Sequence, residues 1–171
     1  MANTVRDLPG ASWLLDAFRL AERPSAPDLV GHECEECDEL RNDLLRFTNR
    51  TLPVDAIRSH FGDLALLTDL AFRYFLPAYI SVALDGQPGT LDEQVREFVL
   101  FSLYPSGEHA DSEYILRRLR PLTPEELNAV LQALERLASD PKHEYDHTEA
   151  REAIEWWRTR LLPSLQDDAS L

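Results

Sequence analysis

Apolar side chains recur at spacings of three and four along most of this chain, which is the pattern of helices that bury one face. The strongest helix start is at Thr123, a capping threonine followed by Pro124 at the first helical position and Glu126 at the third. Apolar residues then follow at helical spacing: Leu127, Val130, Leu131 and Leu134. This segment is therefore predicted to be a helix that begins with a capping box.

The same periodicity predicts six further helices, over about residues 12–21, 36–47, 53–61, 68–84, 90–103 and 148–161. Ser12, Thr90 and Thr148 are expected to cap three of them, and Glu93 is expected to complete a capping box at Thr90. Prolines that follow two of these segments are placed to end them.

Residues 68–84 are the most apolar stretch, and their apolar side chains cover more than one helix face. A helix of this kind is typically buried on most sides, so we expect it at the centre of the fold. Pro77 lies inside the stretch, where it removes one backbone donor and crowds the carbonyl of Arg73. We therefore expect a kink or a break near Pro77.

Together these segments predict an all-α fold, either a compact bundle of seven or eight helices or a short irregular stack of helical pairs. A length of 171 residues is enough for one domain with its own core. We expect a single helical domain over residues 1–171, with frayed ends at 1–10 and 164–171.

The chain is strongly acidic, with 17 lysines and arginines against 31 aspartates and glutamates and a formal charge of −14. Such a charge repels phosphate backbones and anionic lipids, so we expect neither nucleic acid nor a membrane as partner. It also speeds the encounter with a basic protein. The N-terminal sequence lacks the pattern of a secretory signal, and no apolar run is long enough to span a membrane. These features predict a cytoplasmic protein.

Both cysteines and one histidine lie close together, at His32, Cys34 and Cys37. If a helix begins near Glu36, Cys34 lies in the turn before it and Cys37 in its first turn, so both sulfurs can face one point that His32 can also reach. Tetrahedral zinc takes four ligands, and we choose His60 as the fourth because it ends the next short helix. Rival candidates in or near expected loops are His143, His147 and His109.

Three interpretations of the Cys34-x-x-Cys37 pair remain open. A structural zinc ion fits the acids around the pair, which favour a cation: Glu33, Glu35, Glu36 and Asp38. The same acids discourage thiolate formation, and a thioredoxin-like redox pair also needs a strand before the helix, so redox catalysis is disfavoured. In the third interpretation, two reduced cysteines only pack at a helix start.

Other features of the sequence are weaker indications of a functional site. Arg117, Arg118 and Arg120 form a basic run that could bind an anion or pair with nearby glutamates. Trp156 and Trp157 point to different helix faces, so we expect Trp157 in the core and Trp156 partly exposed, where it could anchor a partner. The sequence contains no glycine-rich phosphate loop, no nucleophile elbow and no H-E-x-x-H motif.

Two segments resemble a known family. The motif H-x-C-x-x-C-D-E-L at residues 32–40 and the segment A-F-R-Y-F-L-P-A-Y at residues 71–79 are similar to those of a family of small, mainly bacterial domains of unknown function. The resemblance extends from about Ala11 to Leu137. It implies no activity, but it implies that four residues act together: His32, Cys34, Cys37 and His60.

We therefore expect a non-catalytic protein-binding module with a structural zinc site, for example an antidote-type (immunity) protein that neutralises a basic toxin. One alternative is a zinc-dependent hydrolase that uses His32, Cys34 and Cys37 and keeps a water molecule on the metal. Another alternative is a structural module of a larger assembly.

Overall fold

The computed structural model describes residues 3–105, 112–142, 147–163 and 165. Over these residues the chain forms eight α-helices and no strand, which confirms the predicted all-α fold. The helices are α1 (Ala11–Ala17), α2 (Glu35–Leu44), α3 (Val54–Ser59), α4 (Asp69–Asp85), α5 (Leu91–Leu103), α6 (Ser112–Leu119), α7 (Pro124–Ser139) and α8 (His147–Trp156). Short 3-10 helices cover Val5–Asp7 and Asp63–Ala65, and α8 continues into a π-helical turn at Trp157–Leu161.

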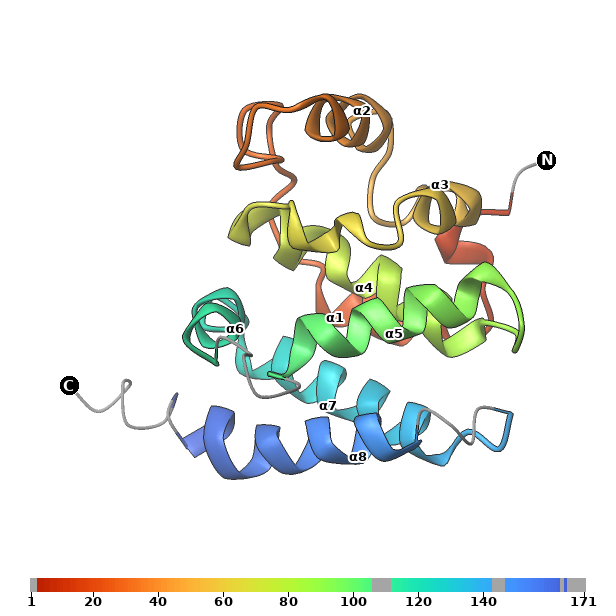
Figure 1. Cartoon of the computed structure of the whole chain (residues 1–171), viewed down its shortest axis with the longest axis vertical. Helices are drawn as coiled ribbons and strands as arrows, with labels where there is room; N and C mark the ends of the chain where they lie inside the picture. Colours follow the sequence, from red (N-terminus) through yellow and green to blue (C-terminus); the bar gives the residue numbers. More distant parts are fainter. Residues whose placement is uncertain (1–2, 106–111, 143–146, 164, 166–171) are drawn as a thin grey trace.

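Helix α4 lies in the middle of the molecule, as its apolar composition predicted, and packs against α1, α3, α5, α6 and α7 (Figure 1). Helices α7 and α8 lie side by side at one end of the long axis, and α2 with the loop before it lies at the opposite end. The cysteine segment is therefore remote from the α7–α8 pair. Among the helices that the structure describes, none combines the length and apolar character that a membrane span requires.

Of the kink or break expected at Pro77, the break is not found. The helix runs from Asp69 to Asp85 without interruption, and Pro77 is buried within it. The hydroxyl of Ser81 donates to the Pro77 carbonyl at 2.7 Å. Because most of α4 is buried against neighbouring helices, its tertiary packing outweighs the loss of one backbone donor.

The capping box at the start of α7 is confirmed. The N–H of Glu126 donates to the Thr123 hydroxyl at 3.3 Å, and the N–H of Thr123 donates to the Glu126 carboxylate at 2.7 Å. At α5, Thr90 caps the helix as predicted, but Glu93 accepts the N–H of Gly89 instead of the N–H of Thr90. The predicted capping box at α5 is therefore wrong.

Other helix starts differ from the sequence prediction by one or two residues. Gly10 precedes α1 in a left-handed conformation with a φ of 80°, which glycine adopts without strain, so Ser12 lies inside the helix instead of capping it. Helix α8 begins at His147, one residue before Thr148. Near the N-terminus, the N–H of Val5 donates to the carbonyl of Leu52 at 3.0 Å, and the side chain of Val5 is fully buried.

Helix α6 was not among the segments that periodicity predicted. Its buried face consists of Ile115, Arg118 and Leu119, so an arginine occupies a position where the pattern needed an apolar residue. The prediction for the tryptophans is confirmed. Trp157 is fully buried and donates its ring N–H to the carbonyl of Leu103 at 2.7 Å, whereas Trp156 is partly exposed.

Candidate cysteine site

Cys34 and Cys37 lie together at the N-terminus of α2. Cys34 is the capping residue, with an extended backbone, and its sulfur accepts the N–H of Cys37 at 3.2 Å. The two sulfurs are 2.7 Å apart. The sequence prediction that Cys34 precedes a helix and Cys37 lies in its first turn is confirmed, although the helix begins at Glu35, one residue earlier than expected.

The two thiols have different surroundings. Cys34 is exposed to solvent, whereas Cys37 is fully buried in the hydrophobic core. The adjacent Cys34 thiol, burial and the charge of Glu36 raise the pKa of the Cys37 thiol to about 11. At neutral pH Cys37 therefore keeps its proton, and a metal ion that binds its sulfur has to displace that proton.

Backbone contacts hold the loop before the cysteines against the segment that leads into α4. Val30 and Leu67 form an isolated antiparallel bridge. The N–H of Thr68 donates to the carbonyl of Leu29 at 3.1 Å, and the Thr68 hydroxyl donates to the carbonyl of Asp28. The N–H of Gly31 also donates to the carbonyl of Leu66 at 3.5 Å, so the backbone is held up to residue 31, and residues 31–36 are exposed.

Arg118 supports this segment from α6. Its guanidinium donates to the carbonyls of Leu64 at 3.1 Å and Leu67 at 2.9 Å, and it lies 4.0 Å from the ring centre of Phe72. Burial lowers the pKa of Arg118, and its side chain is only 2% exposed. Arg118 is therefore not accessible to an anion in solvent, and the carboxylate beside it is that of Asp69, at 3.7 Å. The spacing of Arg118 from Ile115 and Leu119 was the signal that placed it on the buried face.

Two hollows open beside the cysteine segment, and His32 lines both of them. The larger, of about 670 Å³, lies between the 26–33 loop and α2, where Asp38 and Arg41 line it. The smaller, of about 320 Å³, lies between Gly31 and the segment 65–69, with Tyr114 on its wall. His32 is exposed and stands two residues before Cys34. Its imidazole is therefore accessible from solvent on a part of the loop that is not buried.

His60 forms a separate cluster. It is 8% exposed, its Nδ1 lies 2.7 Å from Asp63 Oδ2, and its Nε2 lies 3.1 Å from Asp43 Oδ2. Burial alone would lower its pKa, but the hydrogen bonds and charges of the two carboxylates outweigh burial, and the pKa is raised. Both ring nitrogens are thus engaged by carboxylates that link α2, α3 and the turn after α3.

The structure brings Cys34 and Cys37 together but does not gather His32 and His60 around them. Within residues 3–105, 112–142, 147–163 and 165, no group of three or more histidine, cysteine, aspartate or glutamate side chains is arranged to hold a metal ion. Of the rival ligands, His109 and His143 lie outside the described residues, as does the side chain of His147. Zinc binding therefore stays a prediction.

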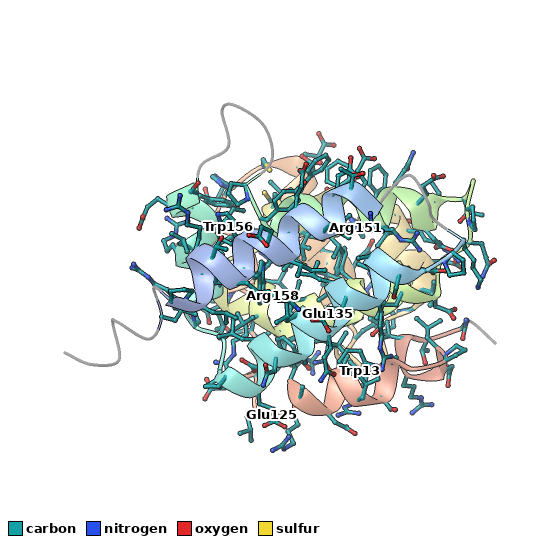
Figure 2. All side chains as sticks on the ribbon, turned by 90° about the horizontal axis from the view of Figure 1, so that it is seen from below. Trp13, Glu125, Glu135, Arg151, Trp156 and Arg158 are labelled. Carbon is teal, nitrogen blue, oxygen red and sulfur yellow. The ribbon has the colours of Figure 1, made fainter. Side chains whose placement is uncertain are left out.

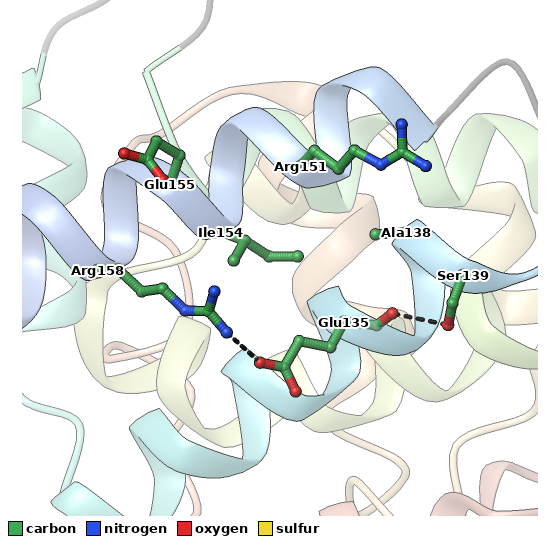
Figure 3. A pocket seen from close by; sticks show the side chains of 7 residues that line it. All are labelled: Glu135, Ala138, Ser139, Arg151, Ile154, Glu155 and Arg158. Carbon is green, nitrogen blue, oxygen red and sulfur yellow. Dashed lines mark hydrogen bonds and ion pairs between the residues drawn. The ribbon is translucent and has the colours of Figure 1, made fainter.

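A further hollow, of about 410 Å³, lies between α7 and α8, on the face seen from below in Figure 2. Arg158, in the π-helical turn that continues α8, reaches across it to Glu135 of α7, with 2.7 Å between Nη2 and Oε1, and Ile154 lies between the helices (Figure 3). The hydroxyl of Ser139 is engaged by the Glu135 carbonyl in its own helix. This mixture of paired charges and apolar side chains fits a seam between packed helices.

Residues 31–161 match the model of a family of unknown function, DUF6714. The chain belongs to this family. The match begins directly before the cysteine segment and takes in α2 to α8, whereas the resemblance expected from the sequence ran from about Ala11 to Leu137. Helix α1, which packs on α4 and α7, lies outside the part of the chain that DUF6714 covers. No curated protein and no solved structure matches the chain.

Proposed function

We propose that this member of DUF6714 is a non-catalytic protein-binding module in which Cys34, Cys37 and His32 hold a structural zinc ion. Its acidic surface would bind a basic protein partner, as an antidote-type (immunity) protein that neutralises a basic toxin would do. The observation that carries the zinc proposal is the placement of both sulfurs side by side at the start of α2.

The chemistry of the donors supports zinc. Thiolates and imidazoles are the ligands that Zn²⁺ prefers in structural sites. Two of these donors are adjacent in the structure, and the third, His32, lies on an exposed part of the loop, so it can turn toward the sulfurs without uncovering core residues. The exposed carboxylates around the pair add negative charge that attracts a cation: Glu33, Glu35, Glu36 and Asp38.

His60 remains the predicted fourth ligand. It could serve only if its ring exchanged Asp43 or Asp63 for the ion, because both nitrogens are engaged. Asp43 is the more exposed of the two carboxylates, with 49% of its side chain accessible against 16% for Asp63. Release of Asp43 to solvent is therefore the less costly exchange.

Elemental analysis of the reduced protein tests the zinc proposal. After incubation with zinc and removal of the excess, the wild-type protein should retain about one ion per chain. Cys34→Ser and Cys37→Ser should abolish retention, and His32→Ala should weaken it. His60→Gln reports on the fourth position in the same assay. A wild-type protein that retains no zinc, or cysteine variants that retain as much as wild type, would refute the proposal.

A capture experiment with a charge-neutralised control tests the proposal that the partner is a basic protein. The bait is the full chain, and the control carries glutamine or asparagine at four exposed acids: Glu33, Glu35, Glu36 and Asp38. A basic partner should be captured by the wild-type bait at low salt, less at moderate salt, and less by the neutralised bait. Capture that is equal for both baits, or no capture at low salt, contradicts this part of the proposal. Turnover of a hydrolysable substrate that a chelator abolishes would favour the hydrolase instead.

A further inference from the structure

The two cysteines differ in access as well as in position. Cys34 is exposed to solvent, and Cys37 behind it is fully buried. A reagent that approaches from solvent therefore meets the sulfur of Cys34 first. The sulfur of Cys37 can be reached only by its neighbour, so a bond to Cys37 has to form through Cys34.

The geometry at the start of α2 suits a bond between the two sulfurs. They are 2.7 Å apart, and a disulfide bond measures about 2.05 Å, so a small movement brings them to bonding distance. Because the backbone of Cys34 is extended, its side chain lies over the first turn of α2. The N–H of Cys37 donates to the Cys34 sulfur and can remain there when this sulfur carries the negative charge of an attacking thiolate.

The charge around the pair selects the reagent. Four exposed carboxylates flank the sulfurs: Glu33, Glu35, Glu36 and Asp38. Arg41 is the cation nearby, and it is bound to Asp38. An anionic disulfide is therefore repelled from Cys34, whereas a cationic disulfide is attracted. The acidic residues around the cysteines, which disfavour redox catalysis, thus favour a positively charged partner for disulfide exchange.

We propose that Cys34 and Cys37 form a reversible disulfide by exchange with a positively charged disulfide. The Cys34 thiolate attacks one sulfur of R–S–S–R and expels RS⁻, which takes a proton and leaves as RSH. Cys37 then loses its proton and attacks the Cys34 sulfur of the mixed disulfide, and the second RSH leaves. The protein is oxidised from dithiol to disulfide, and the small disulfide is reduced to two thiols. The exchange uses the same sulfurs as the zinc proposal, but it takes place in the metal-free protein.

Reaction of the full chain with three disulfides tests the proposal. The protein is reduced, freed of metal by a chelator, and exposed to cystamine, hydroxyethyl disulfide or glutathione disulfide, which are cationic, neutral and anionic. Intact mass should show the loss of two hydrogens and no lasting adduct. Cystamine should react faster than glutathione disulfide by roughly tenfold, and salt should reduce this ratio. A protein that keeps both thiols free, or carries stable adducts only, overturns the disulfide.

A charge variant separates local electrostatics from the intrinsic reactivity of the reagents. Glu35→Gln with Glu36→Gln removes two exposed charges next to the sulfurs and should reduce the cystamine-to-glutathione-disulfide ratio. A ratio that is the same in this variant and in wild type overturns the choice of a cationic partner.

Cysteine variants test the order of attack. Cys37→Ser should stop at a stable mixed disulfide on Cys34, whereas Cys34→Ser should leave a buried thiol that does not react. Equal reactivity of the two variants overturns the assigned order, and circular dichroism verifies that each variant is folded. If Cys37→Ser does not fold, Cys37→Ala replaces it. Zinc retention is measured on reduced protein and disulfide formation on metal-free protein, so failure of one is distinguishable from failure of the other.

Discussion

Glu126 and Glu36 both lie in the first turn of a helix, yet their carboxylates have opposite environments. Glu126 at the start of α7 is fully buried, where its carboxylate accepts the N–H of Thr123 and hydrogen bonds from Nε and Nη2 of Arg73 in α4. Glu36 at the start of α2 is exposed. In the helical body a carboxylate is fixed by its partners and holds two helices together, whereas at the cysteine segment the carboxylates are solvated and set a local potential.

The helical body, with buried carboxylates such as Glu126, stabilises the molecule, whereas the cysteine segment, with exposed carboxylates such as Glu36, forms the candidate site. The stability of the body depends on buried groups such as Glu126, whose partners are fixed, and changes there should cost much free energy. The cysteine segment buries little except Cys37, and changes to its exposed residues should alter binding and reactivity with little effect on folding.

The largest effect is expected at Glu126. Glu126→Ala leaves Arg73 without its carboxylate and removes the capping box of α7, so it should lower the free energy of unfolding by about 3–5 kcal/mol. Glu125→Ala, one residue earlier, breaks only the exposed pair with Arg19 and should cost at most about 1 kcal/mol. Urea unfolding of both variants measures the difference. Equal costs would contradict the role of burial.

The two adjacent tryptophans give the second test. Trp157→Phe removes the N–H that donates to the buried carbonyl of Leu103, and should cost about 1–3 kcal/mol. Trp156→Phe changes a partly exposed side chain and should cost less than about 1 kcal/mol. Thermal unfolding of the two variants under identical conditions provides the comparison. A larger loss of stability in Trp156→Phe than in Trp157→Phe would mean that the buried and exposed helix faces are wrongly assigned.

The sequence predicts features that depend on neighbouring residues. The capping box of α7 and the placement of Cys34 and Cys37 at a helix start follow from a few consecutive residues, and both are confirmed. The pair formed by Arg73 and Glu126 joins residues 53 positions apart, so no local pattern indicates it.

The rest of the candidate site depends on contacts of the same long-range kind. Val30 and Leu67 each line one of the two hollows beside the cysteines and pair with each other from distant parts of the chain. The carboxylate partners of His60 come from α2 and from the turn after α3. Helix α6 was missed because its buried face includes Arg118, whose guanidinium donates to carbonyl groups and lies 3.7 Å from the carboxylate of Asp69.

The cysteines themselves give a smaller, asymmetric prediction for the reduced, metal-free protein. Cys37→Ser places a hydroxyl in the core and should cost about 1–3 kcal/mol. Cys34→Ser puts one of the favoured capping residues at the start of α2, where its hydroxyl can accept the N–H of residue 37, so stability should be unchanged or slightly higher. Chemical unfolding in the presence of a chelator tests this asymmetry, and a marked loss in Cys34→Ser would contradict it.

The last prediction concerns acid stability. Burial raises the pKa of Asp92, but hydrogen bonds from Arg58 and from the N–H of Gln87 outweigh it, and the pKa is lowered overall. A carboxylate of this kind stabilises the fold above its unfolded pKa of about 3.9, and the stabilisation is lost as pH falls through the lower, folded value.

The unfolding free energy of the wild-type protein should therefore fall steeply below about pH 4, and Asp92→Asn should flatten this dependence. Asp55→Asn is the matched control, because Asp55 pairs with the same Arg58 but its side chain is 82% exposed. It should leave the pH profile close to that of wild type. Identical profiles for Asp92→Asn and Asp55→Asn would contradict the role of the buried pair.

X-ray absorption at the zinc edge of the zinc-loaded protein tests the central claim most directly, because it identifies the atoms bound to the ion. The proposed site predicts two sulfur neighbours at about 2.3 Å, from Cys34 and Cys37, together with nitrogen at about 2.0–2.1 Å from His32. A zinc shell made of oxygen and nitrogen alone, with no sulfur neighbour, would contradict it.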